Sequence, residues 1–492
     1  MNHLSIPTTR LPFGALALLV GCSLLPAQIT PGNLVVLRVG DGAAALGSAA
    51  SPTFYEQMST AGVPVSTLAL PTAVSGANRR CTNSGSATSE GFLTQSFDGR
   101  FLVSAGYDAD PSTPAVAGTA SATVARVAAR VALDGSIDTS TAVTDGYNTS
   151  NVRSATSNDG SDIWLCGNGA SGTGGVRYAA LGGSTSVQLS STVTNLRVTN
   201  IFGGQLYCSS ASGAFQGVSA VGSGLPTTSG QTTTLLPGFP TASGPSSYDY
   251  FFADASTLYV ADDRATAGGG IQKWLLISGT WTLQYTLQPA GASGTGTVGC
   301  RGLTGEVVGG VATLYATTTE TSANRVVKVT DTGAASTYSL VSTAAANTAY
   351  RGLRLVRCPS ARVDFFGTGT AHTAGTPQIG ATANFTLGAS VGVTANGMLP
   401  SDVAVFVVGL RIPPIDLSLS GAQPGSLFHL YILDYVGLPT DGTGAATWNL
   451  TVPTDTALCG GELSWQMIQI DFALPYSLPV ALSQGMTTRV GI

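Results

Sequence analysis

Four side chains that could hold a metal ion stand in comparable places along the chain, each at the start of a short apolar run. They are Glu90, Asn151, Asn195 and Asp249. Carboxylate and amide oxygens are the ligands that a hard cation such as calcium prefers, and a bound cation can polarise an ester carbonyl for hydrolysis. The alternative is structural, because Asn and Asp also initiate turns. No catalytic residue can be assigned beside these four.

Further charged residues that could contact a ligand accompany this set. Near the starts of the same kind of run lie Arg153, Arg197, Arg301 and Arg351. They would either face a ligand or donate hydrogen bonds to backbone carbonyls of neighbouring strands. Asp262 and Asp263 close the segment "DASTLYVADDR" and have no charged counterparts in three of four related segments. We therefore add the loop that holds them to the candidate ligand-binding residues.

The scarcity of histidine excludes histidine-dependent catalysis and metal binding from most of the chain. After His3, the only histidines are His372 and His429. Residues 30–360 therefore contain no Ser-His-Asp triad and no histidine-ligated metal. His429 lies in "SLFHLYIL", where strand alternation predicts a solvent-facing side chain.

The scaffold that must position these residues is a set of repeated hairpins. Each repeat consists of an apolar run, a two-residue turn and an alternating run that contains Trp or Tyr. The turns are Asp98-Gly99, Asp159-Gly160, Gly203-Gly204, Asp254-Ala255 and Gly309-Gly310. Asp-Gly and Gly-Gly favour primed turns, whose twist suits a β-hairpin. The recurring aromatic residues, Trp164, Tyr207, Tyr259 and Tyr315, are expected to pack between repeats.

Each hairpin is followed by a second pair of predicted strands, in 123–143, 175–191, 213–236, 271–287 and 324–341. A sixth segment, 350–359, has a first strand but no clear second one. Its outer pair is predicted at the other end of the chain, in 33–42 and 63–71. Repeats of four strands are typical of propeller blades. We predict an all-β protein with a six-bladed β-propeller over 30–360, closed by its N-terminal strands. Seven blades is the alternative.

The phrase "LYVADDR" resembles segments common in NHL-type and lactonase-type propellers. Six-bladed lactonase-type propellers place carboxylates and amides around the central channel to hold a hard cation. The resemblance therefore implies a calcium cofactor at Glu90, Asn151, Asn195 and Asp249, on residue type and rough position alone.

The last quarter of the chain has a different pattern. Residues 361–492 carry strand-like runs such as "VAVFVVGL", "ATWNLTVP" and "SWQMIQIDF", separated by turn signals. They predict an antiparallel β-sandwich of seven or eight strands. The run from "GTGTAHTAG" to "TTRVGI", with "ANFTL" and "TDGTGAATWNLTVP", resembles a C-terminal module that recurs on secreted proteins of planctomycete-type bacteria. That resemblance implies an accessory module on an exported protein.

Residues 1–27 are typical of a targeting segment, with the apolar run 11–25 after Arg10. Two processing sites are possible by pattern. "LVGC" fits a lipobox that would make Cys22 a lipidated N-terminus, and "LPAQ" fits signal cleavage after Ala27. We predict a bacterial protein that is secreted, periplasmic or at the cell surface, and lipid-anchored if Cys22 is used. No later segment predicts a membrane span.

Six cysteines follow Cys22, an even number that favours disulfides in an exported protein. Cys166 and Cys208 occupy matching places in neighbouring repeats and are the predicted pair. With a net charge of −5, and with Lys273 and Lys328 as its only lysines, the chain is not expected to bind nucleic acid.

These observations favour an exported binding or structural propeller protein, with a protein or carbohydrate ligand at the cell surface. The alternative is a calcium-dependent, lactonase-like hydrolase that uses the central channel.

Overall fold

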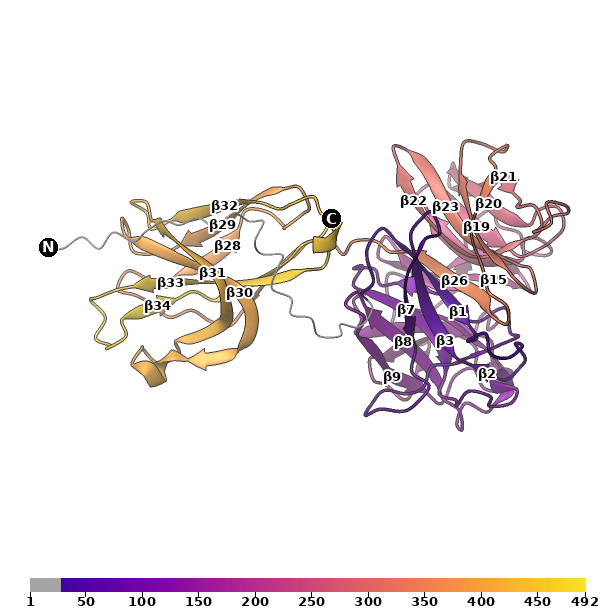
Figure 1. The fold of residues 1–492 in the computed structure, drawn as a ribbon, viewed down its shortest axis with the longest axis horizontal. Coiled ribbons are helices and arrows are strands. Elements are labelled where there is room, and N and C mark those ends of the chain that lie inside the picture. Colours follow the sequence, from indigo (N-terminus) through magenta and orange to yellow (C-terminus); the bar gives the residue numbers. More distant parts are fainter. Residues whose placement is uncertain (1–27) are drawn as a thin grey trace.

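The computed structural model describes residues 28–492, so the predicted targeting segment and Cys22 lie outside it. The protein is all-β, and the described residues contain six four-stranded antiparallel sheets followed by two further sheets near the C-terminus (Figure 1). No helix within residues 28–492 has the length and apolarity needed to cross a membrane.

Five of the four-stranded sheets use consecutive strands. Their bounds are β6 Thr94–Gln95, β7 Phe101–Tyr107, β8 Arg126–Ala132 and β9 Ile137–Val143; β10 Val152–Ser157, β11 Asp162–Gly167, β12 Gly175–Ala180 and β13 Val187–Gln188; β14 Thr199–Phe202, β15 Gln205–Ser212, β16 Phe215–Val221 and β17 Thr233–Leu235; β18 Ser247–Phe252, β19 Thr257–Asp262, β20 Gly270–Ile277 and β21 Thr280–Leu287; β22 Cys300–Val308, β23 Val311–Thr318, β24 Arg325–Thr330 and β25 Tyr338–Thr343.

The predicted hairpins are confirmed at these five sheets. Each first strand pairs antiparallel with its second across the predicted turn. The turn glycines adopt positive φ, for example 57° at Gly203 and 75° at Gly204, which a residue with a side chain rarely tolerates. The predicted packing role of the aromatic residues is confirmed at three positions, because Trp164, Tyr259 and Tyr315 are buried.

The sixth sheet joins distant parts of the chain, in the order β26-β1-β3-β4. Its strands are β26 Ala349–Leu355, β1 Leu34–Val39, β3 Thr53–Met58 and β4 Pro64–Ala69. β1 pairs directly with β26 and so takes the second place in the sheet, where we had expected the third (Figure 1). The third place belongs to β3, which the sequence analysis missed because Thr53, Glu56 and Gln57 interrupt its apolar pattern.

The first strands of the six sheets follow one another around a circuit, which the second strand of the third sheet helps to close, and we call β6, β10, β14, β18, β22 and β26 the ring. β6 contacts β10 and β26, β10 contacts β14, and β22 contacts both β18 and β26; β18 meets the third sheet through β15. Separate apolar clusters fill the spaces between successive sheets. The ring therefore gathers one strand from each sheet around a common centre.

The C-terminal residues form two antiparallel sheets that share one apolar core. One contains β27 Arg362–Phe366, β35 Gly485–Arg489, β33 Glu462–Ile470, β30 Val403–Asp416, β31 Leu427–Pro439 and β34 Val480–Leu482. The other contains β28 Gln378–Ala381, β29 Ser390–Asn396 and β32 Ala446–Thr451. Trp465 and Phe406 from the larger sheet pack with Val393 from the smaller. Elsewhere in the chain, the two-residue strands β2 Ala50–Ser51 and β5 Asn83–Ser84 pair with each other. The remaining elements of the described chain are four short 3₁₀ turns: η2 Val116–Gly118, η3 Ala170–Gly172, η4 Leu417–Ser420 and η5 Thr456–Leu458.

Candidate functional site

Irregular pairing near the start of the ring strands positions the candidate site. The register between first and second strands shifts at Arg153 in β10, at Tyr248 and Asp249 in β18, and at Arg301 in β22. A corresponding shift lies at Arg351 in β26. A β-bulge breaks the strict in-and-out alternation of a strand and re-aims the side chains that it contains. In four sheets the candidate side chains thus lie at an irregularity of the same kind.

Four guanidinium groups gather at this end around the ring of Tyr248, and we call Arg153, Arg197, Arg301 and Arg351 the arginine cluster. The Cζ atoms of Arg197 and Arg301 lie 4.6 and 5.7 Å from the centroid of the Tyr248 ring. Tyr248 is itself buried. Cations over an aromatic face are attracted by its quadrupole, so Tyr248 holds two of the four charges in place.

The other two members of the cluster are buried and incompletely bonded. Arg153 donates through Nη1 to Asn195 Oδ1 at 2.6 Å and to the Leu196 carbonyl at 2.7 Å. Arg351 donates through Nη2 to the Gly85 carbonyl at 2.8 Å. The Nε atoms of both side chains are buried without a hydrogen-bond partner. Each guanidinium therefore keeps donor capacity that the surrounding backbone does not use.

Like charges and burial disfavour the protonated form of these buried arginines. Burial, followed by the charge of Arg197, lowers the pKa of Arg153 to about 10. Burial, followed by the charge of Arg301, lowers the pKa of Arg351 to about 10. Two carboxylates, those of Glu90 and Asp263, oppose these four positive charges. The Asp263 carboxylate lies 3.4 Å from Arg301. The end of the ring carries more positive than negative charge.

Glu90 and Asn151 do come together, but as partners of each other. Glu90 is fully buried and accepts from the Tyr107 hydroxyl at 2.6 Å, from the Ser84 backbone N–H at 3.0 Å and from the Asn151 amide. Burial raises the pKa of Glu90, and these donors partly oppose the rise.

The predicted calcium site is not assembled. Besides the Glu90–Asn151 pair, the Asn195 oxygen is occupied by Arg153, and Asp249 is neutralised by Arg354. An arginine already supplies the charge that a cation would bring to Asp249. Among residues 28–492 there is also no group of three or more His, Cys, Asp or Glu side chains that could hold a metal ion.

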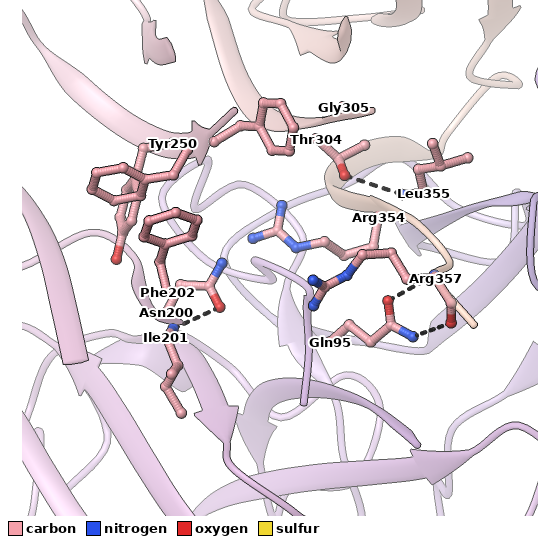
Figure 2. Close-up of a pocket in the computed structure, with 12 residues that line it drawn as sticks. Gln95, Asn200, Ile201, Phe202, Tyr250, Thr304, Gly305, Arg354, Leu355 and Arg357 are labelled. Carbon is pink, nitrogen blue, oxygen red and sulfur yellow. Dashed lines mark hydrogen bonds between the residues drawn. The ribbon is translucent and has the colours of Figure 1, made fainter. Parts of the chain in front are cut away.

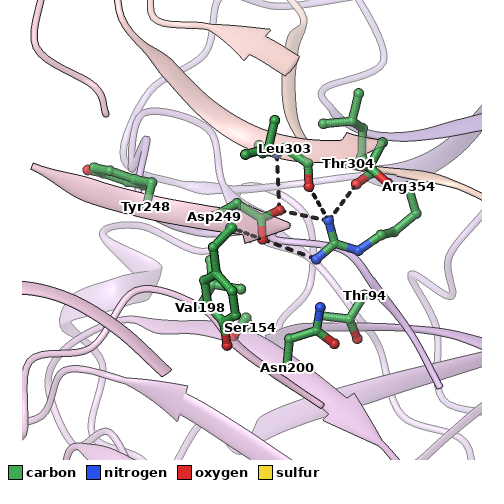
Figure 3. Close-up of polar contacts among 12 residues, drawn as sticks. Thr94, Ser154, Val198, Asn200, Tyr248, Asp249, Leu303, Thr304 and Arg354 are labelled. Carbon is green, nitrogen blue, oxygen red and sulfur yellow. Dashed lines mark hydrogen bonds and ion pairs between the residues drawn. The ribbon is translucent and has the colours of Figure 1, made fainter. Parts of the chain in front are cut away.

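Asp249 instead joins non-adjacent sheets across the ring (Figure 3). It is fully buried, and its carboxylate accepts from Arg354 Nη1 at 2.9 Å and Nη2 at 3.1 Å, and from the Leu303 backbone N–H at 3.1 Å. Burial raises the pKa of Asp249, and the charge of Arg354 opposes that rise. Phe92, next to β6, reaches the ring of Tyr248 with a centroid distance of 5.7 Å. These contacts fill the middle of the ring and separate its two ends.

The two aspartates of "LYVADDR" have different roles. Asp262 is fully buried and bonded to Arg264 and Gln272, so it fixes its own loop and does not face a ligand. Asp263 reaches the arginine cluster through Arg301. Of the predicted pair, only Asp263 belongs to the candidate site.

The predicted disulfide is wrong. Cys166 and Cys208 are buried free thiols, and Cys81 and Cys300 are free as well. Cys166 Sγ contacts the Ser154 hydroxyl at 3.2 Å. Packed sheets stand about 10 Å apart, whereas a disulfide needs Cα atoms within about 7 Å, so matching positions in neighbouring sheets do not favour a bond. Cys358 and Cys459 form the disulfide that the described residues contain.

The expected exposure of His429 is also wrong. Its side chain is 7% exposed and packs edge-on against Phe366, at a ring-centroid distance of 5.2 Å. Burial, followed by the charge of Arg411, lowers the pKa of His429. It lies in the C-terminal sheets and takes no part in the site.

Tyr248, Phe92 and Arg354 are the site residues that sequence reasoning missed. The run "RGLRLVR" places arginines at intervals of three, which an alternating strand would send to opposite faces. The bulge at Arg351 changes that alternation. The arginine-rich run was the available signal in the sequence. The faces that its side chains take depend on the bulge, which the residue types do not predict.

Comparisons with known proteins identify no family. No protein-family model matches the chain, and no curated protein does. Among solved structures, a "putative 6-phosphogluconolactonase" from Bacteroides uniformis is 12% identical, with 85% of this chain and all of that chain covered and a TM-score of 0.35. A protein from Lactobacillus plantarum is 9% identical, with 85% and 99% covered and a TM-score of 0.29. A prolyl endopeptidase structure is 12% identical, with 73% and 47% covered and a TM-score of 0.31. No residue role is transferred from these similarities.

Proposed function

We propose that this is an exported binding protein whose arginine cluster captures an anionic group of an extracellular ligand. Six four-stranded sheets arranged in a circuit support a six-bladed β-propeller as its scaffold. Two sheets around one core support a C-terminal β-sandwich. We also propose that this sandwich is the accessory module of planctomycete-type secreted proteins suggested by the sequence.

The observation that carries the proposal is the pair of buried, incompletely bonded guanidinium groups, Arg153 and Arg351, at one end of the ring. Buried polar groups in proteins are normally paired, and an unpaired one indicates a missing partner. The partner that suits a positively charged donor is an anion. Carboxylate, sulfate and phosphate oxygens all suit the planar donor fork of arginine.

The setting favours an acidic carbohydrate or protein surface as the source of that anion. The site lies at one end of a ring whose middle is crossed by the Asp249–Arg354 and Phe92–Tyr248 contacts, and buried Tyr248 holds Arg197 and Arg301 there. A ligand would therefore be held at the surface of the ring and would not thread through it. The disulfide Cys358–Cys459 supports an oxidising location outside the cytoplasm.

The alternative, a calcium-dependent lactonase-like hydrolase, is less well supported. Its proposed ligands are distributed over three separate hydrogen-bond groups, and Asp249 has an arginine where the cation would sit. Calcium titration distinguishes the two hypotheses, because a cation that binds the folded state must raise the unfolding temperature.

The test is a sulfate titration of the chain from residue 28, with chloride at matched ionic strength as reference. Sulfate should raise the unfolding temperature of the unaltered protein more than that of Arg197→Gln, because the general stabilising effect of sulfate is shared by both, and calorimetry on the unaltered protein should give a saturable isotherm. Arg197→Gln should weaken sulfate binding about tenfold or more, because one charge-assisted contact is lost. Arg197 is only half-buried, so the variant should fold.

Arg79→Gln is the matched control, since Arg79 is exposed and lies outside the cluster. It should bind sulfate like the unaltered protein, and calcium should leave all three proteins unchanged. Sulfate that acts no differently from chloride, or that binds Arg197→Gln normally, would overturn the proposal. A calcium-dependent rise in unfolding temperature would favour the hydrolase instead.

A further inference from the structure

A cavity lies further along the same ring strands, beyond the Asp249–Arg354 pair (Figure 2). Its volume is about 80 Å³. Five of the six ring strands or their immediate extensions line it, with Gln95, Asn200, Phe202, Thr304, Arg354 and Arg357 among the lining residues. On β14 the cavity begins three residues after Arg197, and on β26 it begins three residues after Arg351. It therefore belongs to the opposite end of the ring from the arginine cluster.

Arg357 supplies the chemistry of this cavity. Gln95 clamps its backbone, accepting from the Arg357 N–H at 2.9 Å and donating to the Arg357 carbonyl at 2.8 Å. Within residues 28–492 its guanidinium has neither a hydrogen-bond acceptor nor an ion-pair partner. Figure 2 shows this group pointing into the same space as the guanidinium of Arg354. Asp249 offsets the charge of Arg354, so Arg357 leaves one uncompensated positive charge in the cavity.

The opposite wall is aromatic. Phe202 and Phe252 stack with centroids 4.6 Å apart, and Phe251 lines the same space. Asn200 stands between the two walls. Its side-chain oxygen accepts from the Ile201 N–H at 2.9 Å, which leaves the amide N–H groups as donors, and Figure 2 shows the amide nitrogen turned toward the two guanidinium groups. The cavity thus combines a cation and an amide donor on one side with flat apolar surface on the other.

We propose that this cavity binds a small carboxylate that carries a flat apolar group. The carboxylate would accept a bidentate contact from Arg357 and a hydrogen bond from Asn200, while the apolar group would lie against Phe202 and Phe251. The volume holds the carboxylate and a few attached carbon atoms, and the exposed side of the cavity at Arg357 leaves room for the rest of an aromatic ring. This site is independent of the arginine cluster, because the Asp249–Arg354 and Phe92–Tyr248 contacts separate them.

The experiment uses benzoate as the probe and benzamide as its uncharged counterpart. Calorimetry on the chain from residue 28 should detect benzoate and not benzamide. Arg357→Gln should weaken benzoate at least about tenfold, while Arg357→Lys should restore part of the affinity as a point charge. Arg357 is exposed, so these variants should unfold at nearly the same temperature as the original.

Exposed Arg79→Gln is the control and should leave benzoate affinity unchanged. Arg197→Gln, at the other end of the ring, distinguishes the two sites, because a loss of benzoate affinity in that variant would assign benzoate to the arginine cluster and overturn the proposal. A crystal soaked with 4-bromobenzoate should place the bromine beside Phe202 by its anomalous signal. The proposal fails if Arg357→Gln binds benzoate normally, if benzamide binds equally well, or if the bromine lies among Arg153, Arg197, Arg301 and Arg351. That last result would leave the proposed function intact.

Discussion

At the scale of single residues, the protein concentrates buried charge at the centre of its ring. Asp249 is matched by Arg354 with two charge-assisted hydrogen bonds, so this pair is internally complete. Arg153 and Arg351 are not complete, because each retains an unpaired Nε. The contrast separates a charge pair that is satisfied within the protein from two guanidinium groups that keep an unused donor.

Glu90 should make anion binding depend on pH. Its charge opposes an anion beside Arg351, and burial raises its pKa. Sulfate affinity should therefore increase, up to about tenfold, as pH falls through this raised pKa and the carboxyl becomes neutral. Sulfate keeps both of its charges while Glu90 titrates, so the change in affinity that calorimetry measures reports the protein. The other groups near Glu90 are Tyr107, whose pKa is raised well above its ordinary value, Asn151, which does not titrate, and the guanidinium groups of Arg126 and Arg153.

Glu90→Gln provides the control for that profile, and sulfate affinity in this variant should be nearly independent of pH. A profile equally steep in the variant would exclude Glu90 as the titrating group. The same raised pKa has a consequence for stability: the folded state binds this proton more tightly than the unfolded state. The contribution of Glu90 to stability is thus present at low pH and lost as pH rises through the raised pKa.

At the scale of elements, the repeated bulges and the placement of β1 decide how the six sheets are built. β1 has partners on both sides, β26 and β3, although more than 300 residues separate it from β26. β4 is the outermost strand of the same sheet. A strand that is hydrogen-bonded on both sides tolerates the loss of a backbone donor far less than an edge strand does.

Proline substitutions should separate these two positions. Val36→Pro in β1 should lower the free energy of unfolding by about 3 kcal/mol or more, because Val36 is buried and its strand is paired on both sides. Val65→Pro in β4 should cost less than about 1 kcal/mol, because Val65 is 51% exposed and lies at a register shift. Urea unfolding measures both. Equal losses would contradict the placement of β1 inside the sheet.

At the scale of the whole molecule, a disulfide joins the six sheets to the C-terminal sheets. Cys358 follows β26 and Cys459 precedes β33, with a sequence separation of 101 and 5.3 Å between their Cα atoms. The cross-link closes a loop that contains much of the C-terminal core. A cross-link of this kind restricts the unfolded chain most strongly when the loop is long.

Replacing both cysteines by serine should destabilise the C-terminal sheets by up to about 4.7 kcal/mol, the entropic value for a loop of about 100 residues. Denaturant unfolding followed by tryptophan fluorescence reports this, because Trp448 and Trp465 lie in the C-terminal core. Reducing agent should reproduce the effect in the original protein and have no further effect on the variant. If reduction leaves the transition unchanged, the disulfide does not stabilise this part.

The sequence by itself determined the hairpins, because a primed turn needs only local residues such as Gly203-Gly204 and an alternating run on each side. From residue type it also identified Arg153, Arg197, Arg301 and Arg351 as candidate ligand-binding residues. Only the tertiary structure decided which groups these side chains contact. Bulges reset the alternation of the ring strands, Arg354 crossed the ring to neutralise Asp249, and Cys358 met Cys459. These outcomes depend on contacts between distant segments and on small shifts of register, which a local pattern of residues does not encode.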